Sequence, residues 1–342
     1  MSASRLHRRT IPPPAASTED VRATIDRSGS GAPASGHAVR DLFSTDEIFQ
    51  RLVATADEEF VRSTRLLFLS GLAAGLSIGV SFVARSVVTA SAGAGGELIG
   101  NILYPIGFLL IVLGRYQLFT ENTLTPVTLV LTRIASVPQL LRVWGVVLAA
   151  NVVGAALIAL LLATTGVLDP DSAAVARSFG KHGLEFGWNT LFWKGVIAGW
   201  LVASMVWLNH AARESTTRFF IVLFVMYLIP SLDLFHCVIG ACEMFYLIFL
   251  GEATLGAAGA FFSAVVLGNT VGGVLLVAIL NYAQIRERRF PDRDCDDLTL
   301  TWREFMFGLE PGSQPGPARD GADRAVEEES RLDRPVPVEE TS

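Results

Sequence analysis

The sequence predicts an all-α membrane protein with six transmembrane helices, arranged as two inverted halves of three helices each. Charge is scarce in the middle of the chain, apolar segments there have the length of membrane spans, and short motifs recur in order. Of 342 residues, 51% are apolar and 18% are charged, whereas about a quarter of an ordinary soluble domain is charged. Residues 66–282 contain 9 basic and 9 acidic residues, so the net charge of −6 lies outside this region.

This composition excludes several classes of protein. A soluble globule or a nucleic-acid-binding protein would not have so apolar a centre. The 3 cysteines are too few for a disulfide framework, and no Cys-x-x-Cys or His-rich spacing points to a metal. The sequence has no His-Glu-x-x-His motif, no P-loop and no pattern of a Ser-His-Asp triad. We therefore expect neither an enzyme nor a protein that holds a metal or cofactor.

Six apolar regions follow one another between two polar tails. About 20 apolar residues suffice for one crossing, and two of the regions are much longer. Both long regions are interrupted by polar residues, GRYQLFTENTLTP at 114–126 and PSLDLFHC at 230–237, which predicts two broken helices. The predicted spans are residues 66–84, 99–131, 143–165, 186–207, 219–250 and 257–282.

The membrane domain is predicted at residues 61–286, with repeat halves at about 62–165 and 186–285. Residues 1–60 and 287–342 are predicted to be largely disordered tails, since they are too polar to bury a core; a short amphipathic helix is expected just before the first span. Arg and Lys gather at alternate ends of the spans, which places both termini in the cytoplasm. We expect a multi-pass protein of the plasma (inner) membrane, surrounded by the lipid bilayer.

Three pairs of short motifs predict an internal repeat, because they occur in the same order at similar offsets. Each half would hold an odd number of spans, so the second half must be inverted relative to the first. The two breaks would then meet near the midplane, where non-helical backbone must be buried or line a cavity. The pairs are FLSGLAAG (68–75) with FWKGVIAG (192–199), LFT (118–120) with LFH (234–236), and NVVGA (151–155) with NTVGG (269–273).

His236 is the only histidine of the sequence within a predicted span. Thr120 is its partner in the motif alignment. Away from water an imidazole is expected to be neutral, and it could donate a hydrogen bond or a proton to an incoming anion. The alternative interpretation is a structural histidine bonded to a backbone carbonyl. The Thr120 hydroxyl is suited to bind either His236 or the solute.

Arg115, Glu121 and Glu243 also fall within predicted spans. Charges inside a membrane usually pair, so we expect Arg115 to form an ion pair with Glu121 or Glu243 that holds the broken helices together. Direct contact of Arg115 with the solute is the alternative.

GFLLIVLGRYQLFTENTLTPV (107–127), followed by LFH and GNTVGG, resembles the formate/nitrite transporter family, which moves small monovalent anions through an aquaporin-like homopentamer. The resemblance extends over about residues 62–286 and is that of a divergent branch, because Phe235 stands where the family has an acidic residue. It implies a solute pore in each protomer. The pore residues that it implies are the central His236, the loop residues Thr120 and Phe119, and the constriction residues Tyr104, Phe108 and Ile229.

The leading hypothesis is therefore a channel or proton-linked carrier for a small weak-acid anion. An anion in a dry pore is costly unless it is neutralised, and proton transfer near His236 would achieve this. A pore for a neutral solute such as water, ammonia or hydrogen sulfide is one alternative. A membrane scaffold or regulator without transport is another.

Overall fold

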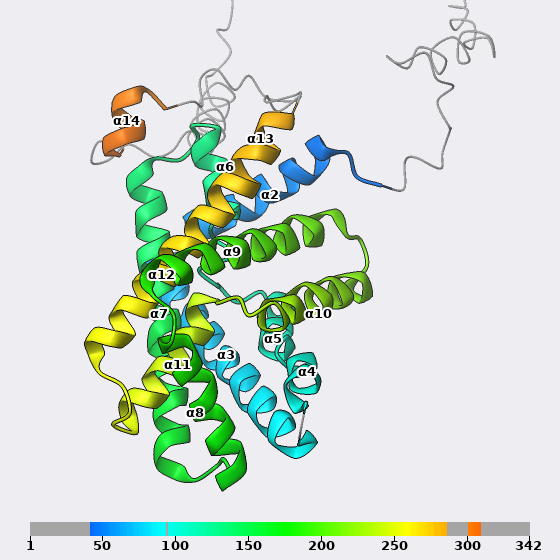
Figure 1. Ribbon diagram of the computed structural model, residues 1–342. Helices are drawn as coiled ribbons and strands as arrows, with labels where there is room; N and C mark the ends of the chain where they lie inside the picture. Colours follow the sequence, from blue (N-terminus) through cyan, green and yellow to red (C-terminus); the bar gives the residue numbers. More distant parts are fainter. Residues whose placement is uncertain (1–41, 94, 286–299, 309–342) are drawn as a thin grey trace, which may run out of the picture. The chain divides into compact units, whose positions relative to one another are not determined.

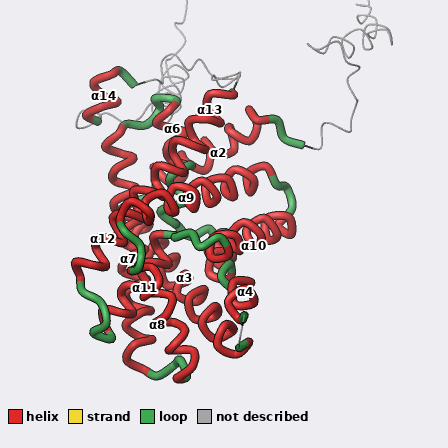
Figure 2. The backbone as a smooth tube through the Cα atoms, in the orientation of Figure 1, coloured by secondary structure: helices red, strands yellow, loops and turns green. Residues whose placement is uncertain are grey.

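The computed structural model describes residues 42–93, 95–285 and 300–308, and within them every regular element is a helix (Figures 1 and 2). This confirms the predicted all-helical class. The helices are α2 (Thr45–Val61), α3 (Thr64–Ala92), α4 (Gly96–Gly100), η2 (Asn101–Leu103), α5 (Ile106–Gly114), α6 (Thr125–Leu131), α7 (Val137–Thr165), α8 (Pro170–Leu184), α9 (Trp188–Ala211), α10 (Ser215–Ser231), α11 (Cys237–Phe249), α12 (Leu255–Gly273), η3 (Val274–Ile279), α13 (Leu280–Gln284) and α14 (Trp302–Phe307).

Among the described residues, five helical stretches are long and apolar enough to cross a membrane. They begin with α3, α4, α7, α9 and α12, and the last continues without interruption through the π-helical segment η3 to Gln284. Helices α10 and α11 are apolar but shorter. The sequence predicts six crossings in two halves of three. The described residues contain five long apolar stretches and two short apolar helices, so the layout of three plus three helices stays a prediction.

Two helices break where the sequence predicts, and both end in the same way. Helix α5 ends at Arg115 (φ 56°) and α10 is followed by Asp233 (φ 55°), both in the left-handed region. The Tyr116 N–H then bonds back to the Ile111 carbonyl (3.0 Å), and the Leu234 N–H to the Ile229 carbonyl (2.8 Å). Such six-to-one bonds are typical of helix C-termini, where glycine usually takes the left-handed position.

A buried asparagine holds the non-helical backbone of the first break. Asn151, on α7, donates from Nδ2 to the carbonyls of Gly71 (2.8 Å) and Gln117 (2.9 Å), and its Oδ1 accepts from the Phe119 N–H (2.9 Å). These bonds connect the break to α7 and α3 at once. Backbone groups buried in this way cost free energy unless they find partners.

Asn269, on α12, holds the second break with an equivalent set of bonds. Its Nδ2 donates to the carbonyls of Gly195 (2.9 Å) and Phe235 (3.1 Å), and its Oδ1 accepts from the Cys237 N–H (2.9 Å). Phe119 therefore corresponds to Cys237, at an offset of 118 residues. The two sets of anchoring bonds are thus offset by 118 residues, whereas the LFT and LFH motifs are offset by 116.

The same two asparagine-bearing helices cross their neighbours closely, α7 against α3 and α12 against α9 (Figure 1). A Cβ on Gly75 would collide with the Asn151 carbonyl oxygen, and one on Gly199 with the Asn269 carbonyl oxygen. These glycines therefore act in packing, as expected for small residues where membrane helices approach closely.

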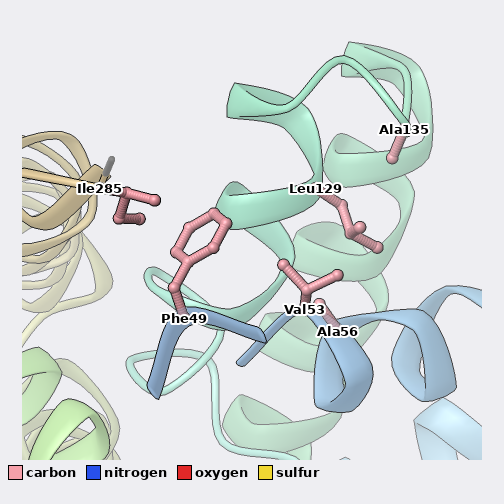
Figure 3. Packing of buried hydrophobic residues seen from close by; sticks show 6 residues of the cluster. All are labelled: Phe49, Val53, Ala56, Leu129, Ala135 and Ile285. Carbon is pink, nitrogen blue, oxygen red and sulfur yellow. The ribbon is translucent and has the colours of Figure 1, made fainter. Parts of the chain in front are cut away.

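Helix α2 packs on α6, confirming the helix expected before the first span. Phe49, Val53 and Ala56 of α2 bury their side chains against Leu129 and a neighbouring residue, Ile285 (Figure 3). Of the polar C-terminal region, residues 300–308 are described, and Leu300 and Trp302 contact the loop after α6. There the Arg133 guanidinium donates to the Leu300 carbonyl (2.6 Å) and lies 4.8 Å from the Trp302 ring centroid. Most of both predicted tails lies outside the described residues.

Replacing Asn151 with alanine is expected to destabilise the protein. The buried Phe119 N–H and the Gln117 carbonyl would lose their partner, at about 1–3 kcal/mol for each unsatisfied buried group. Thermal unfolding of the purified protein in detergent should show a clearly lower midpoint. Asn281→Ala is the control, since among the described residues the Asn281 side chain bonds to the Val277 carbonyl of its own helical stretch and to no other group. Equal midpoints for both variants would contradict the anchoring role.

Candidate functional site

His236 and Thr120 meet where the two breaks come together. His236 precedes α11 as its N-cap, Thr120 follows the end of α5, and both are fully buried. His236 Nε2 lies 2.8 Å from Thr120 Oγ1. The expectation that the two breaks meet is thus supported by a direct hydrogen bond between these side chains.

The neighbouring backbone defines the protonation of this pair. The Val238 N–H donates to His236 Nδ1 (3.3 Å), so that nitrogen is an acceptor and the ring proton resides on Nε2. Nε2–H therefore donates to Thr120 Oγ1. Among the described residues this is the one bond to the Thr120 hydroxyl oxygen, which leaves the hydroxyl hydrogen available to a further acceptor. The arrangement thus offers one unused donor, the Thr120 O–H, supported by a neutral imidazole.

Aromatic side chains continue from His236 toward α4. The Phe108 ring meets the imidazole edge-on, with centroids 5.0 Å apart, and stacks on Tyr104 at 5.5 Å. Phe119 lies elsewhere, against Trp144 of α7 at 6.0 Å, and Ile229 is buried near the end of α10. Of the six predicted pore residues, four therefore form one connected group.

One cavity borders this group, and a second cavity borders the first break. The α8-side cavity, about 40 Å³, is lined by His236, Tyr104, Arg85, Glu243 and residues of α8 and the second break. The α2-side cavity, about 550 Å³, is lined by residues of α2, α5, α9 and α10 together with the first break. A cavity needs roughly 10–15 Å³ to hold one water, so even the smaller cavity admits a solute of a few heavy atoms.

The expected pairing of Arg115 with Glu121 or Glu243 is wrong. Arg115 Nη2 lies 3.2 Å from Glu58 Oε2 of α2, and the Arg115 side chain is 71% exposed. The left-handed Arg115 ends α5, so its side chain leaves the bundle on the side of α2. Glu121 lines the α2-side cavity, whereas Glu243 lines the α8-side cavity and lies nearest to Arg85.

The sequence places Asp233 and Lys194 as charges within apolar regions, but it predicts neither their mutual contact nor the place of Arg85 inside a helix. Arg85 was assigned to the end of the span at 66–84, but α3 continues to Ala92, so Arg85 lies inside the helix. Lys194 Nζ bonds to Asp233 Oδ2 (2.6 Å), and His182 Nε2 lies 2.8 Å from Asp233 Oδ1. Burial lowers the pKa of His182, but its bonds and charge interactions with Asp233 and Glu185 outweigh this effect and raise the pKa overall.

Glu59 of α2 is the buried carboxyl on the α2 side. Both of its oxygens accept from Thr125 Oγ1, at 2.8 and 3.1 Å. Burial raises its pKa from an ordinary 4.5 to about 7, although the Thr125 and Gln117 hydrogen bonds and the charge of Arg62 lower it in part. Glu59 was missed because α2 was expected to lie on the membrane surface, where a glutamate would be solvated.

Comparison with known sequences decides the family. A sequence model described as Formate/nitrite transporter matches residues 46–283, most of the chain. The chain belongs to the formate/nitrite transporter family. Inner membrane protein YfdC of Escherichia coli (strain K12) is 32% identical over 247 residues, which cover 70% of this chain and 78% of the relative. Formate channel FocA of Haemophilus influenzae is 30% identical over 180 residues, which cover 51% of this chain and 63% of that protein.

Solved structures share the fold. An FNT family ion channel superposes with a TM-score of 0.63 at 20% identity, covering 70% of this chain and 98% of the other. A structure described as a pentameric formate channel with formate bound gives a TM-score of 0.55 at 23% identity, covering 64% and 96%. Members of the formate/nitrite transporter family are channels or transporters rather than enzymes, and this member is a multi-pass membrane protein.

The raised pKa of Glu59 predicts that docking of α2 depends on pH. A carboxyl whose pKa is raised in the folded state favours folding most below its unfolded pKa, and this contribution is lost as the pH rises through the folded pKa. Helix α2 should therefore be held less firmly at pH 8 than at pH 4.5, by at most about 3 kcal/mol given the pKa of about 7. The protection factors of the α2 amides, obtained by hydrogen exchange and referred to the intrinsic rate at each pH, measure the effect.

Glu59→Gln should abolish this pH dependence, because a neutral amide accepts the Thr125 hydroxyl at any pH. Glu58→Gln is the matched control, since Glu58 is exposed and pairs with Arg115; it should retain the dependence. This role of Glu59 would be contradicted if the protection factors of α2 changed with pH equally in wild type and in Glu59→Gln.

Proposed function

We propose that this protein carries small monovalent weak-acid anions, formate or nitrite in kind, across the inner membrane. A pore in each protomer would pass between the two breaks, and His236 would make transport depend on pH or couple it to protons. The observation that carries the proposal is the buried His236–Thr120 bond of 2.8 Å at the junction of the broken helices. The relatives named a formate channel and a probable formate transporter support the class of solute.

The local chemistry supports an anion as the solute. His236 is the N-cap of α11, so the partial positive charge of that helix terminus is directed at the junction. The Thr120 O–H is an unused donor, which the imidazole Nε2–H supports through its bond to Thr120 Oγ1, and an anion accepts from donors. In a site lined by Phe108 and Tyr104, an unneutralised anion remains costly. A proton taken from bulk water and passed to the solute near His236 would let the solute cross as a neutral acid, which releases that proton to water on the other side.

Two kinds of contact support the inverted repeat of three plus three helices. Helix ends at Arg115 and Asp233 lie 118 residues apart, and so do the anchoring residues Asn151 and Asn269. Equivalent bonds in both halves are expected where two copies of one folding unit face each other with opposite topology.

Charge supports an orientation with both termini in the cytoplasm. Basic residues are enriched in cytoplasmic loops of membrane proteins. The α2-side cavity is lined by four arginines, Arg51, Arg62, Arg115 and Arg218, so we assign the α2 side to the cytoplasm and the α8 side to the opposite face.

Apolar side chains exposed on the single chain support assembly as a homopentamer within lipid. Trp193 and Trp200 of α9 and Phe224 of α10 are each about half exposed or more. Such surfaces need lipid or neighbouring subunits to cover them, and the structural relative described as a pentameric formate channel provides the precedent.

His236→Asn tests the proposal. Asparagine keeps a hydrogen-bond donor of similar size but cannot titrate near neutral pH. The variant should fold and assemble normally, yet lose the difference in ¹³C-formate uptake that wild-type proteoliposomes show between pH 5 and pH 8. His210→Asn is the control, because His210 bonds to Thr55 and the Val206 carbonyl away from the junction.

Uptake that responds to pH identically in wild type and His236→Asn would make His236 a structural residue. Swelling assays with neutral solutes run in parallel. Wild-type vesicles that pass water or ammonia but no anion would identify a pore for neutral solutes, and vesicles that pass nothing would favour a scaffold.

A further inference from the structure

Arg85 lines the α8-side cavity beside the proposed pore. His236, Tyr104 and Glu243 line the same cavity, whose volume is about 40 Å³. A solute that approaches His236 from the α8 side would therefore meet Arg85 close to the imidazole. The position is internal, since the Arg85 side chain is 13% exposed.

Asn101 and Phe179 hold the guanidinium in place. Arg85 Nε donates to Asn101 Oδ1 (2.9 Å), and the amide of Asn101 lies 3.4 Å from Ser231 Oγ at the end of α10. The guanidinium carbon lies 3.7 Å from the centroid of the Phe179 ring, an arrangement typical of cation–π contact. The Arg85 head is thus fixed in position before any solute arrives.

Its remaining donors are largely unused. Among the described residues, the guanidinium of Arg85 makes one hydrogen bond, from Nε to Asn101. Neither Nη1 nor Nη2 donates a hydrogen bond to these residues. The nearest carboxylate oxygen, Glu243 Oε1, is 3.9 Å from Nη1, too far for a hydrogen bond. A largely buried guanidinium with free N–H groups beside a cavity is suited to accept a ligand.

The neighbouring charges do not satisfy Arg85 either. Asp233 also lines the cavity, but its carboxylate is already bound by Lys194 (2.6 Å) and His182 (2.8 Å). Glu243 is therefore the remaining counter-ion of Arg85. Glu243, on α11, and His236, the N-cap of that helix, line the same cavity. The cavity lining thus brings together Arg85, Glu243 and His236 beside the junction of the two breaks.

We propose that Arg85 forms an anion-binding subsite for planar monovalent oxyanions, in which two guanidinium N–H groups bind the two oxygens of the solute and displace Glu243. The inference rests on the proposed function and adds a residue that determines solute specificity. A planar fork of donors matches carboxylate or nitrite, whereas a lysine ammonium presents a point charge. Glu243 competes with the solute and so keeps its binding weak enough for release.

Binding of ¹³C-formate to the purified full-length protein, followed by NMR line width, tests this subsite, and unlabelled nitrite should compete. Arg85→Gln should weaken the affinity at least about tenfold, the effect expected for loss of charge-assisted hydrogen bonds. Arg85→Lys should bind formate with little preference over chloride. Arg177→Gln should bind like wild type, since Arg177 pairs with Glu252 outside the lining of this cavity.

Glu243→Gln provides the independent test, because removal of the competing carboxylate should tighten formate binding. Should Arg85→Gln fail to fold, unchanged or weaker binding by Glu243→Gln would overturn the subsite. Wild-type protein that binds neither formate nor nitrite, or Arg85→Gln with wild-type affinity, would also overturn it. Uptake assays separate the two proposals: binding that depends on Arg85 without transport would refute the proposed function and leave the subsite in place.

Discussion

The two breaks in the helical bundle depend on one interaction made twice, the side-chain amide of a buried asparagine bound to non-helical backbone. Asn151 and Asn269 each donate two hydrogen bonds and accept one. In an apolar interior, unpaired backbone groups would be costly, and water is not available to replace the lost partners. Because each asparagine lies at a close glycine crossing, the same residue joins the break to two packed helices.

The position of the site follows from these anchors. Asn151 binds the amide of Phe119, the residue before Thr120, and Asn269 binds the amide of Cys237, the residue after His236. Two rigid helices thereby determine where the hydroxyl and the imidazole lie, and the pair meets at 2.8 Å. Charged groups are then divided between two sides of the junction, with Arg85 and Glu243 near α8 and Glu59 and Arg115 near α2. A solute crossing the proposed pore would meet charge, a dry neutral junction, and charge again.

The sequence predicted the features that arise from local pattern and length. Apolar span lengths predicted a helical membrane fold and polar interruptions predicted both breaks, whereas the recurring motifs that contain Asn151 and Asn269 did not reveal their bonds to the breaks. Interactions between distant segments could not be predicted in this way. Arg115 was assigned the wrong partner because its left-handed backbone turns the side chain toward α2. Arg85 was taken as a flanking charge, since no pattern indicated that α3 extends beyond residue 84. Glu59 escaped notice because burial of α2 depends on its packing against α6.

The central claim is that solute passes between Thr120 and His236. The most direct measurement places a thiol there, as Thr120→Cys in a variant whose native cysteines are replaced by alanine. The account predicts that a small charged methanethiosulfonate reagent modifies this thiol, that modification abolishes formate uptake into proteoliposomes, and that excess formate slows the modification. Fully modified protein that still takes up formate at the unmodified rate would contradict it.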